Sequence, residues 1–311
     1  MHALRLLLEW SARRGAALLA VSILLGLGLP PLAALFREAI TPVVACLMTL
    51  VLLRVEMGQV LAFLRRPAQV LALSLWLLLA CPLLAWAVAG AAGLDGPFGA
   101  ALVIMATGCV ATSSPAFARL VGLDGEVAFA LAVITTLLVP LTAPPLALGL
   151  IGIDLAISIG GLMLRLLLVV GLPLLLAMAI RRAAGQQRLA RWGLAVDGAV
   201  VLLVCAYGFG VMDGMLAELR ADPAWVAGGL ALAFGGSLAL NAATALAFLP
   251  AGRRLAMTAG LMSGNRNMAL YLAVLPAATD PAILLFFALC QFPLFFSPFL
   301  LGPLYRRLHH A

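Results

Sequence analysis

The sequence predicts an all-α polytopic membrane protein, with ten transmembrane helices arranged as two inverted five-helix repeats. Three observations lead to this fold class. The 311 residues are 65% hydrophobic and 10% charged, with a mean hydropathy of +1.18, as in proteins that cross the bilayer several times. The apolar residues form ten stretches of bilayer length, and the charges between these stretches alternate in sign. This composition excludes a soluble domain.

Each apolar stretch is long enough to cross a membrane, which takes about 20 residues. Short polar segments separate the stretches, and none of these segments has room for an additional folded domain. We expect the first stretch to be a retained span rather than a signal peptide, because it continues to Phe36. The predicted spans are residues 16–36, 39–57, 68–90, 97–121, 126–150, 156–180, 192–212, 224–249, 255–276 and 281–304.

The charged residues predict the orientation of the spans. Arginines gather before the first span and in every second loop, whereas the other loops are mainly acidic. Arginine-rich loops stay in the cytoplasm, so both termini are expected there. The chain has no lysine, which points to a GC-rich genome and hence to a bacterial inner (plasma) membrane. The net charge of +7 is scattered among apolar runs instead of lying on one solvated face, which argues against nucleic-acid binding.

The two halves of the chain agree in the spacing of their spans. Spans two to five and spans seven to ten start about 155 residues apart, as internal repeats in transporters do. We therefore expect one membrane domain, residues 1–311, made of a first repeat at 1–153 and a second at 154–311. Five spans per repeat is an odd number, so the second repeat must be inserted upside down relative to the first.

Polar residues interrupt the predicted spans four and nine. The first interruption is Gly-Cys-Val-Ala-Thr-Ser-Ser-Pro at 108–115, and the second is Ser-Gly-Asn-Arg-Asn at 263–267. Broken helices at matching places in two repeats mark transporter binding sites. We predict that the interruptions meet and form one pocket. The alternatives are that the first interruption is only a proline kink, and that Arg266 in the second lies in a loop because span nine is drawn wrongly. The candidate substrate-binding residues are Thr112, Ser113, Ser114, Pro115, Asn265, Arg266 and Asn267, together with Gln291, a buried amide of span ten.

Arg266 needs a partner, because a charge inside a membrane is costly unless it is paired or hydrated. Glu126, at the start of span five, is the candidate partner, so Glu126, Ser114 and Arg266 are the candidate ion-coupling residues. Alternatively, Glu126 only stabilises the N-terminus of its own helix, a role for which Asp124 competes. The five cysteines lie in apolar runs and the three histidines are terminal, so no metal site is expected.

Four motifs stand out along the chain, namely Ala106–Pro115, Gly125–Val133, Leu138–Pro144 and Gly264–Leu270. They resemble motifs of the bile acid:sodium symporter family, and the likeness extends from Arg65 to the last span. The resemblance implies a panel domain of spans one, two, six and seven and a core domain of spans three to five and eight to ten. It also implies that spans four and nine cross at their breaks, and that organic anions are transported by alternating access.

The family's ion-site residues are only partly present. Sodium-coupled members carry a Glu before the second break, an amide after the Gly that opens span five, and Gln-Asn at the second break. The matching residues here are Met262, Glu126 and the pair Arg266-Asn267, while Ser114 and Asn267 agree with the family. Sodium prefers hard oxygen ligands, which a thioether does not supply. We therefore expect the Arg266 guanidinium to stand where a sodium ion would.

Together, these expectations predict a secondary active transporter of a small or amphipathic organic anion, with sodium coupling lost or altered. The alternatives are an arsenite-type metalloid exporter using Cys109, and a non-transporting membrane sensor or binding protein. An enzyme is disfavoured, because the predicted spans contain no His or Lys to act as a base. No tightly bound cofactor is expected. Sodium is a doubtful coupling ion, a proton carried by Glu126 is an alternative, and the partners are the organic anion and the lipid bilayer.

Overall fold

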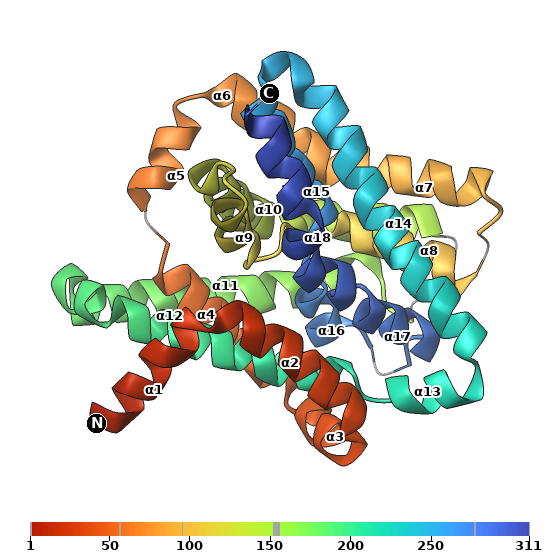
Figure 1. Cartoon of the computed structure of the whole chain (residues 1–311), viewed down its shortest axis with the longest axis horizontal. Coiled ribbons are helices and arrows are strands. Elements are labelled where there is room, and N and C mark those ends of the chain that lie inside the picture. Colours follow the sequence, from red (N-terminus) through yellow and green to blue (C-terminus); the bar gives the residue numbers. More distant parts are fainter. Residues whose placement is uncertain (1, 56, 95, 152–155, 277, 311) are drawn as a thin grey trace. The chain divides into compact units, whose positions relative to one another are not determined.

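The structure is a computed structural model that describes residues 2–55, 57–94, 96–151, 156–276 and 278–310. Within these ranges the chain is helical and contains no β-strand (Figure 1). Six described helices are long and apolar enough to span a membrane, or up to eight spans if two bent helix pairs are counted. The chain forms two compact units. Unit 1 is Met1–Val55, Arg165–Pro223 and Leu272–Val274, and unit 2 is Glu56–Leu164, Ala224–Tyr271 and Leu275–Ala311.

Unit 1 is organised around helix α12, Gln186–Val211, which packs against α1, α2, α3 and α4. Figure 1 shows α12 running along these helices. Glycines make the close packing possible, since a Cβ on Gly198 would stand 1.8 Å from the Leu8 carbonyl oxygen. The other helices of unit 1 are α1 His2–Arg13, α2 Gly15–Gly28, α3 Pro30–Glu38, α4 Ile40–Leu53, most of α11 Ile159–Ala184, and α13 Met215–Ala221.

The predicted first span, 16–36, is not one continuous helix. α2 ends at Gly28 and α3 begins at Pro30, because a proline restricts the residue before it and removes a backbone donor. Leu29 accordingly adopts φ −126° and ψ 68°. α1 and α2 form a pair bent by 92°, and α3 and α4 a pair bent by 66°. The predicted first span is therefore divided between α2 and α3.

Unit 2 contains the interrupted helices, and α10 packs against several of them, including α8, α9 and α15. Predicted span four is divided into α8 Pro97–Thr107 and α9 Ser114–Leu120, and span nine into α15 Arg253–Gly264 and α16 Ala269–Val274, whose last three residues belong to unit 1. Both interruptions predicted from the sequence are confirmed. The remaining elements are α5 Met57–Leu64, α6 Pro67–Leu75, the π-helical turn η1 Trp76–Ala80, α7 Cys81–Ala91, α10 Gly125–Ile151, α14 Pro223–Phe248, the 3-10 turn η2 Leu249–Ala251, α17 Pro281–Leu289 and α18 Gln291–His310.

Candidate functional site

The two interruptions meet within unit 2 and pair through their backbones. Val110 and Arg266 form an isolated antiparallel bridge. The Ala111 amide donates to the Asn265 carbonyl at 2.9 Å, and the Asn267 amide donates to the Cys109 carbonyl at 2.9 Å. Backbone groups released from a helix must be satisfied when they are buried, and here each interruption satisfies the other. We call this paired region, residues 108–113 and 265–268, the crossing.

Close packing of α14 on α15 positions the second interruption. Ser237 Oγ donates to the Gly264 carbonyl at 2.9 Å, and Ser263 Oγ donates to the Leu240 carbonyl at 2.8 Å. A Cβ on Gly264 would lie 2.6 Å from the Ser237 carbonyl oxygen, and one on Gly260 would lie 2.7 Å from Asn241 Oδ1. Small residues four apart allow two helices to approach in this way. The contact fixes the end of α15 from which the crossing continues.

Arg266 is held by main-chain carbonyls. Its Nε donates to the Ser263 carbonyl at 2.8 Å, and its Nη1 donates to the carbonyls of Leu77 at 3.0 Å and Gly108 at 2.9 Å. The side chain is 3% exposed. Ser263 and Gly108 lie at the C-terminal ends of α15 and α8, where the helix dipole is negative and favours a cation. Carbonyls of three segments therefore replace the acidic partner that the sequence led us to expect.

The Leu77 carbonyl is available because of the π-helical turn. The Cys81 amide, which would bond Leu77 in an α-helix, bonds the Trp76 carbonyl instead. The next possible donor is residue 82, which is a proline and has no N–H. π-Helical turns of this kind often accompany functional sites. Pro82 thus leaves a buried carbonyl free to accept from the Arg266 guanidinium.

Three buried polar atoms at the crossing have no hydrogen-bond partner among the described residues. They are Ser114 Oγ, Asn265 Nδ2 and Arg266 Nη2. Ser114 is 0% exposed and Asn265 is 1% exposed, and the Asn265 Oδ1 accepts from Ser297 Oγ at 3.3 Å. An unpaired buried polar group is costly, so such groups are expected to have another partner. Two of the three are N–H donors and the third is a hydroxyl, so each of them can donate a hydrogen bond to an acceptor.

The other candidate residues of the two interruptions lie at the crossing or next to it in the chain, and Gln291 lies in α18. Thr112 and Ser113 are half-buried in the non-helical segment before α9, and Pro115 is buried in the first turn of that helix. Asn267 Oδ1 accepts from the Ala269 amide at 3.0 Å and so satisfies the first backbone donor of α16. Gln291 is buried at the start of α18, where its Nε2 donates to the Phe287 carbonyl at 3.0 Å.

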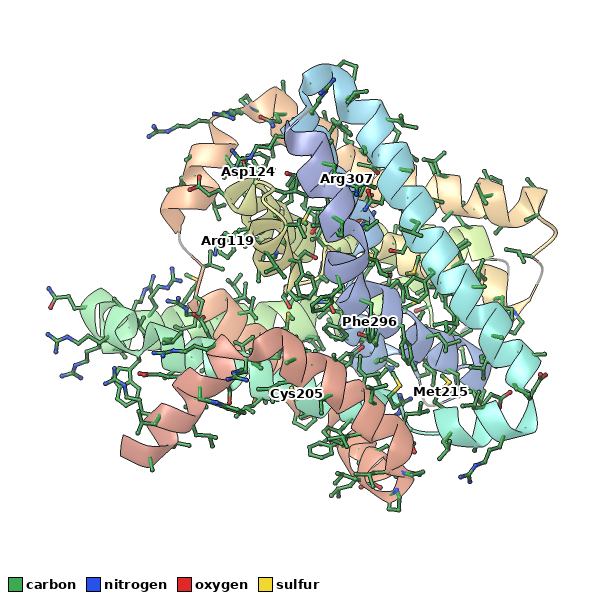
Figure 2. The ribbon with its side chains drawn as sticks, in the orientation of Figure 1. Arg119, Asp124, Cys205, Met215, Phe296 and Arg307 are labelled. Atoms are coloured by element: carbon green, nitrogen blue, oxygen red, sulfur yellow. The ribbon has the colours of Figure 1, made fainter. Side chains whose placement is uncertain are left out.

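The predicted pair of Glu126 and Arg266 is wrong. Glu126 is exposed in the first turn of α10, and no ion pair joins it to Arg266, both of which are described residues. Asp124, labelled in Figure 2, caps α10, since its Oδ1 accepts from the amides of Glu126 and Val127 at 3.0 Å each. The alternative, in which Asp124 competes for the helix terminus, is the correct one. The pair does not form because Glu126 is exposed at the start of α10, whereas Arg266 is buried and hydrogen-bonded to main-chain carbonyls.

Sequence reasoning missed several residues around the site. The π-helical turn brings the Leu77 carbonyl and the Cys81 thiol beside the guanidinium. Tyr271 and Thr107 share a buried hydrogen bond between their hydroxyl groups. Pro82 inside an apolar run was a signal for the free carbonyl. No sequence signal links Tyr271 to Thr107, because their contact depends on how α8 and α16 pack.

A family model described as the Sodium Bile acid symporter family matches residues 41–211. The chain belongs to this family. Its members are transporters and not enzymes, and the apolar helices agree with an integral membrane protein. The matched range contains the first interruption and the Leu77 carbonyl, but it ends before the second interruption and Arg266. A search of curated proteins found no match.

Proposed function

We propose that this protein is a secondary active transporter that carries a small or amphipathic organic anion by alternating access, with its coupling to sodium lost or altered. The proposal depends chiefly on Arg266. This residue places a guanidinium, which stays charged in proteins, among main-chain carbonyls of three segments. Buried charges in membrane domains mark the pathways of substrates and ions. Membership of a transporter family supports the same reading.

The architecture that we propose is ten spans in two inverted repeats. The non-helical segments begin at Gly108 and Asn265, which are 265 − 108 = 157 residues apart, and this spacing supports a repeat. The compact units support a panel and a core. Unit 1 is mainly residues 1–55 and 165–223, where spans one, two, six and seven are predicted, and unit 2 holds the other six.

The chemistry of the crossing disfavours sodium coupling. Carbonyl oxygens can hold a hard cation, but those of Gly108 and Ser263 accept hydrogen bonds from Arg266. Met262, at the position where the family resemblance implies a carboxylate, is fully buried and offers only a thioether. We infer that the Arg266 guanidinium supplies the positive charge that sodium supplies in coupled relatives.

The unpaired polar atoms favour an anionic group on the substrate. Arg266 Nη2 and Asn265 Nδ2 can each donate a hydrogen bond, and the Ser114 hydroxyl can do the same. A carboxylate or a sulfonate accepts such bonds, and bonds between charged groups are the stronger ones. Binding an anion would also offset the cost of burying the guanidinium, so the site gains most from a substrate of negative charge.

Uptake of radiolabelled taurocholate, as a probe amphipathic anion, into proteoliposomes tests the proposal. We expect saturable uptake by the wild-type protein at the same rate in sodium chloride and in choline chloride. Arg266→Gln combined with Met262→Glu and Glu126→Gln restores the side chains that the resemblance implies for sodium-coupled members, and we expect this variant to acquire sodium dependence.

Strong, saturable sodium dependence of the wild-type protein would refute the loss of coupling. If taurocholate is not taken up, melting temperatures of the purified protein with a panel of smaller carboxylates and sulfonates give the second readout. Stabilisation by anions that disappears in Arg266→Gln supports the proposal. The absence of stabilisation by every anion in the panel counts against an anionic substrate.

A further inference from the structure

A second candidate site lies away from the crossing, at one end of unit 2. It is a pocket of about 490 Å³ between the beginnings of α6, α10 and α15 and the end of α14. α6 and the C-terminal end of α14 lie side by side at the top of Figure 1. Arg66 lies at this pocket and Leu77 at the crossing, 11 residues apart along one helical segment, or roughly 16 Å at 1.5 Å per residue. The two sites are therefore separate.

The pocket carries two arginines without an acidic partner. Arg66 and Arg254 line it, and neither forms an ion pair or a side-chain hydrogen bond with any described residue. The acidic lining residue, Asp124, uses its Oδ1 to cap α10. The pocket therefore presents two positive charges against one carboxylate that is already engaged, and it is suited to an anion.

Backbone donors add to the positive character. Arg66 and Gly252 are the N-cap residues of α6 and α15, and neither helix start has a capping side chain. Uncapped N-termini leave amide donors and the positive end of the helix dipole directed outward, and this arrangement favours phosphate. Gly252 adopts φ +108°, a conformation that suits glycine, and this turn carries the chain from η2 into α15.

The rim of the pocket is fixed by hydrogen bonds between elements. The Asp124 amide donates to Thr258 Oγ1 at 3.1 Å, which ties the start of α10 to α15. Thr258 Oγ1 in turn donates to the Arg254 carbonyl at 2.7 Å. Apolar walls complete the lining with Val127, Phe248 and Leu255. A charged head between apolar walls suits a group that carries hydrocarbon as well as negative charge.

We propose that this pocket binds an anionic phosphate group, supplied either by the headgroup of an acidic phospholipid or by a soluble phosphate. Arg66 and Arg254 lie between predicted spans, in segments that the charge distribution assigns to the cytoplasmic side. Basic pockets between membrane helices on that side bind acidic lipid headgroups. This proposal is independent of the transported substrate, because it uses none of the residues of the crossing.

The test uses the full chain purified in a neutral detergent. One arm titrates dioleoyl-phosphatidylglycerol against dioleoyl-phosphatidylcholine by native mass spectrometry, and the other measures the melting temperature with inorganic phosphate. We expect tighter binding of phosphatidylglycerol than of phosphatidylcholine, or stabilisation by phosphate. Arg66→Gln with Arg254→Gln is expected to weaken the binding about tenfold or more.

Two further variants separate a site from general attraction to positive charge. Arg182→Gln with Arg188→Gln removes two exposed arginines of unit 1 at the end of α11 and the start of α12, which the charge distribution assigns to the same membrane side, and we expect binding to be unchanged. Ala72→Phe fills the pocket but keeps both arginines, and we expect it to reproduce the loss.

A response in the lipid arm alone assigns the phosphate to a headgroup, and a response to inorganic phosphate assigns it to a soluble anion. The proposal is overturned if neither ligand binds, if the control pair weakens binding as much as the pocket pair, or if Ala72→Phe binds like the wild type.

Discussion

Arg181 in unit 1 and Arg266 in unit 2 use the same chemistry in different settings. Arg181 Nη2 donates to the carbonyls of Leu53 at 2.8 Å and Val55 at 2.6 Å, at the end of α4, and its side chain is half-buried. Arg266 donates to three carbonyls that come from three different segments, and it is almost fully buried. The first arginine closes one helix end, whereas the second joins helices that are distant in sequence.

The two units also differ in whether an arginine is paired with an acid. In unit 1, Arg54 forms an ion pair, since its Nε lies 2.8 Å from Asp197 Oδ1. In unit 2 no described acid pairs with Arg266, and carbonyls at helix C-termini compensate for the charge. Carbonyls satisfy two of its nitrogens and leave Nη2 without a partner. That remaining donor is the feature most easily explained by a ligand.

Arg266→Met should have the largest effect, because it leaves three carbonyls without their donor and removes the charge from the crossing. We expect the free energy of unfolding to fall by about 3 kcal/mol, the scale of hydrogen bonds from a charged group. The melting temperature and taurocholate uptake of the purified protein measure both losses. Arg266→Lys is the control, which keeps the charge but not the planar fork, and it should fall between wild type and Arg266→Met. An Arg266→Met protein as stable and as active as the wild type would contradict this account.

Gly264→Ala should come next. The added methyl group would stand 2.6 Å from the Ser237 carbonyl oxygen, so α14 and α15 would have to separate. Overpacking of this kind costs about 1–3 kcal/mol, and here it would also displace the second interruption. Thermal unfolding of the variant is the measurement. Gly235→Ala in α14 is the matched control, because a Cβ there meets nothing within 4 Å. Equal melting temperatures for the two variants would argue against tight contact between α14 and α15.

Arg181→Gln should have a moderate effect, since it removes donors from the end of α4 without burying an unpaired charge. We expect a loss of about 1 kcal/mol, typical of a helix-terminus interaction. Chemical denaturation in detergent would measure it. Uptake should remain at the wild-type level, in contrast with Arg266→Met. A loss of uptake as severe as that of Arg266→Met would show that the two arginines do not differ in the way the structure indicates.

Asp197→Asn should have the smallest effect. The side chains of Arg54 and Asp197 are 37% and 44% exposed, so water screens their attraction. Pairs of this kind contribute about 0–1 kcal/mol, and salt weakens them further. Comparison of the melting temperatures of wild type and variant at low and high salt is the check. The difference in melting temperature should shrink as salt increases. A large difference that is insensitive to salt would mean that the ion pair is better shielded from water than its exposed fractions indicate.

The sequence predicted the interruptions well because they are local. Gly108 and Pro115 are poor residues for a helix interior, and a polar run such as Asn265–Asn267 stands out in an apolar span. The prediction that the two breaks meet rested on the repeat and the family motifs, and the bridge between Val110 and Arg266 confirms it. The helix break at Leu29, just before Pro30 and Pro31, was not predicted, because the length of the apolar run was used only as evidence for a membrane span.

The partner of Arg266 could not be predicted. The rule that a membrane charge seeks an opposite charge led to Glu126, but the carbonyls that accept its hydrogen bonds include Leu77 and Gly108, which are 189 and 158 residues away. Every residue has a carbonyl, so composition does not reveal which one is free. The carbonyl of Leu77 is free because of the π-helical turn and because Pro82 has no N–H to donate.

By itself the sequence determined the membrane character of this protein, the limits of long helices such as α10 and α14, the two places where spans four and nine break and the likeness to a transporter family. These properties depend on hydrophobicity and on residues that are close together in the chain. The tertiary structure alone decided that Arg266 is held by carbonyls and not by Glu126, and that Arg66 and Arg254 share a pocket. Those outcomes depend on which helix ends converge, and convergence is set by packing across long sequence separations.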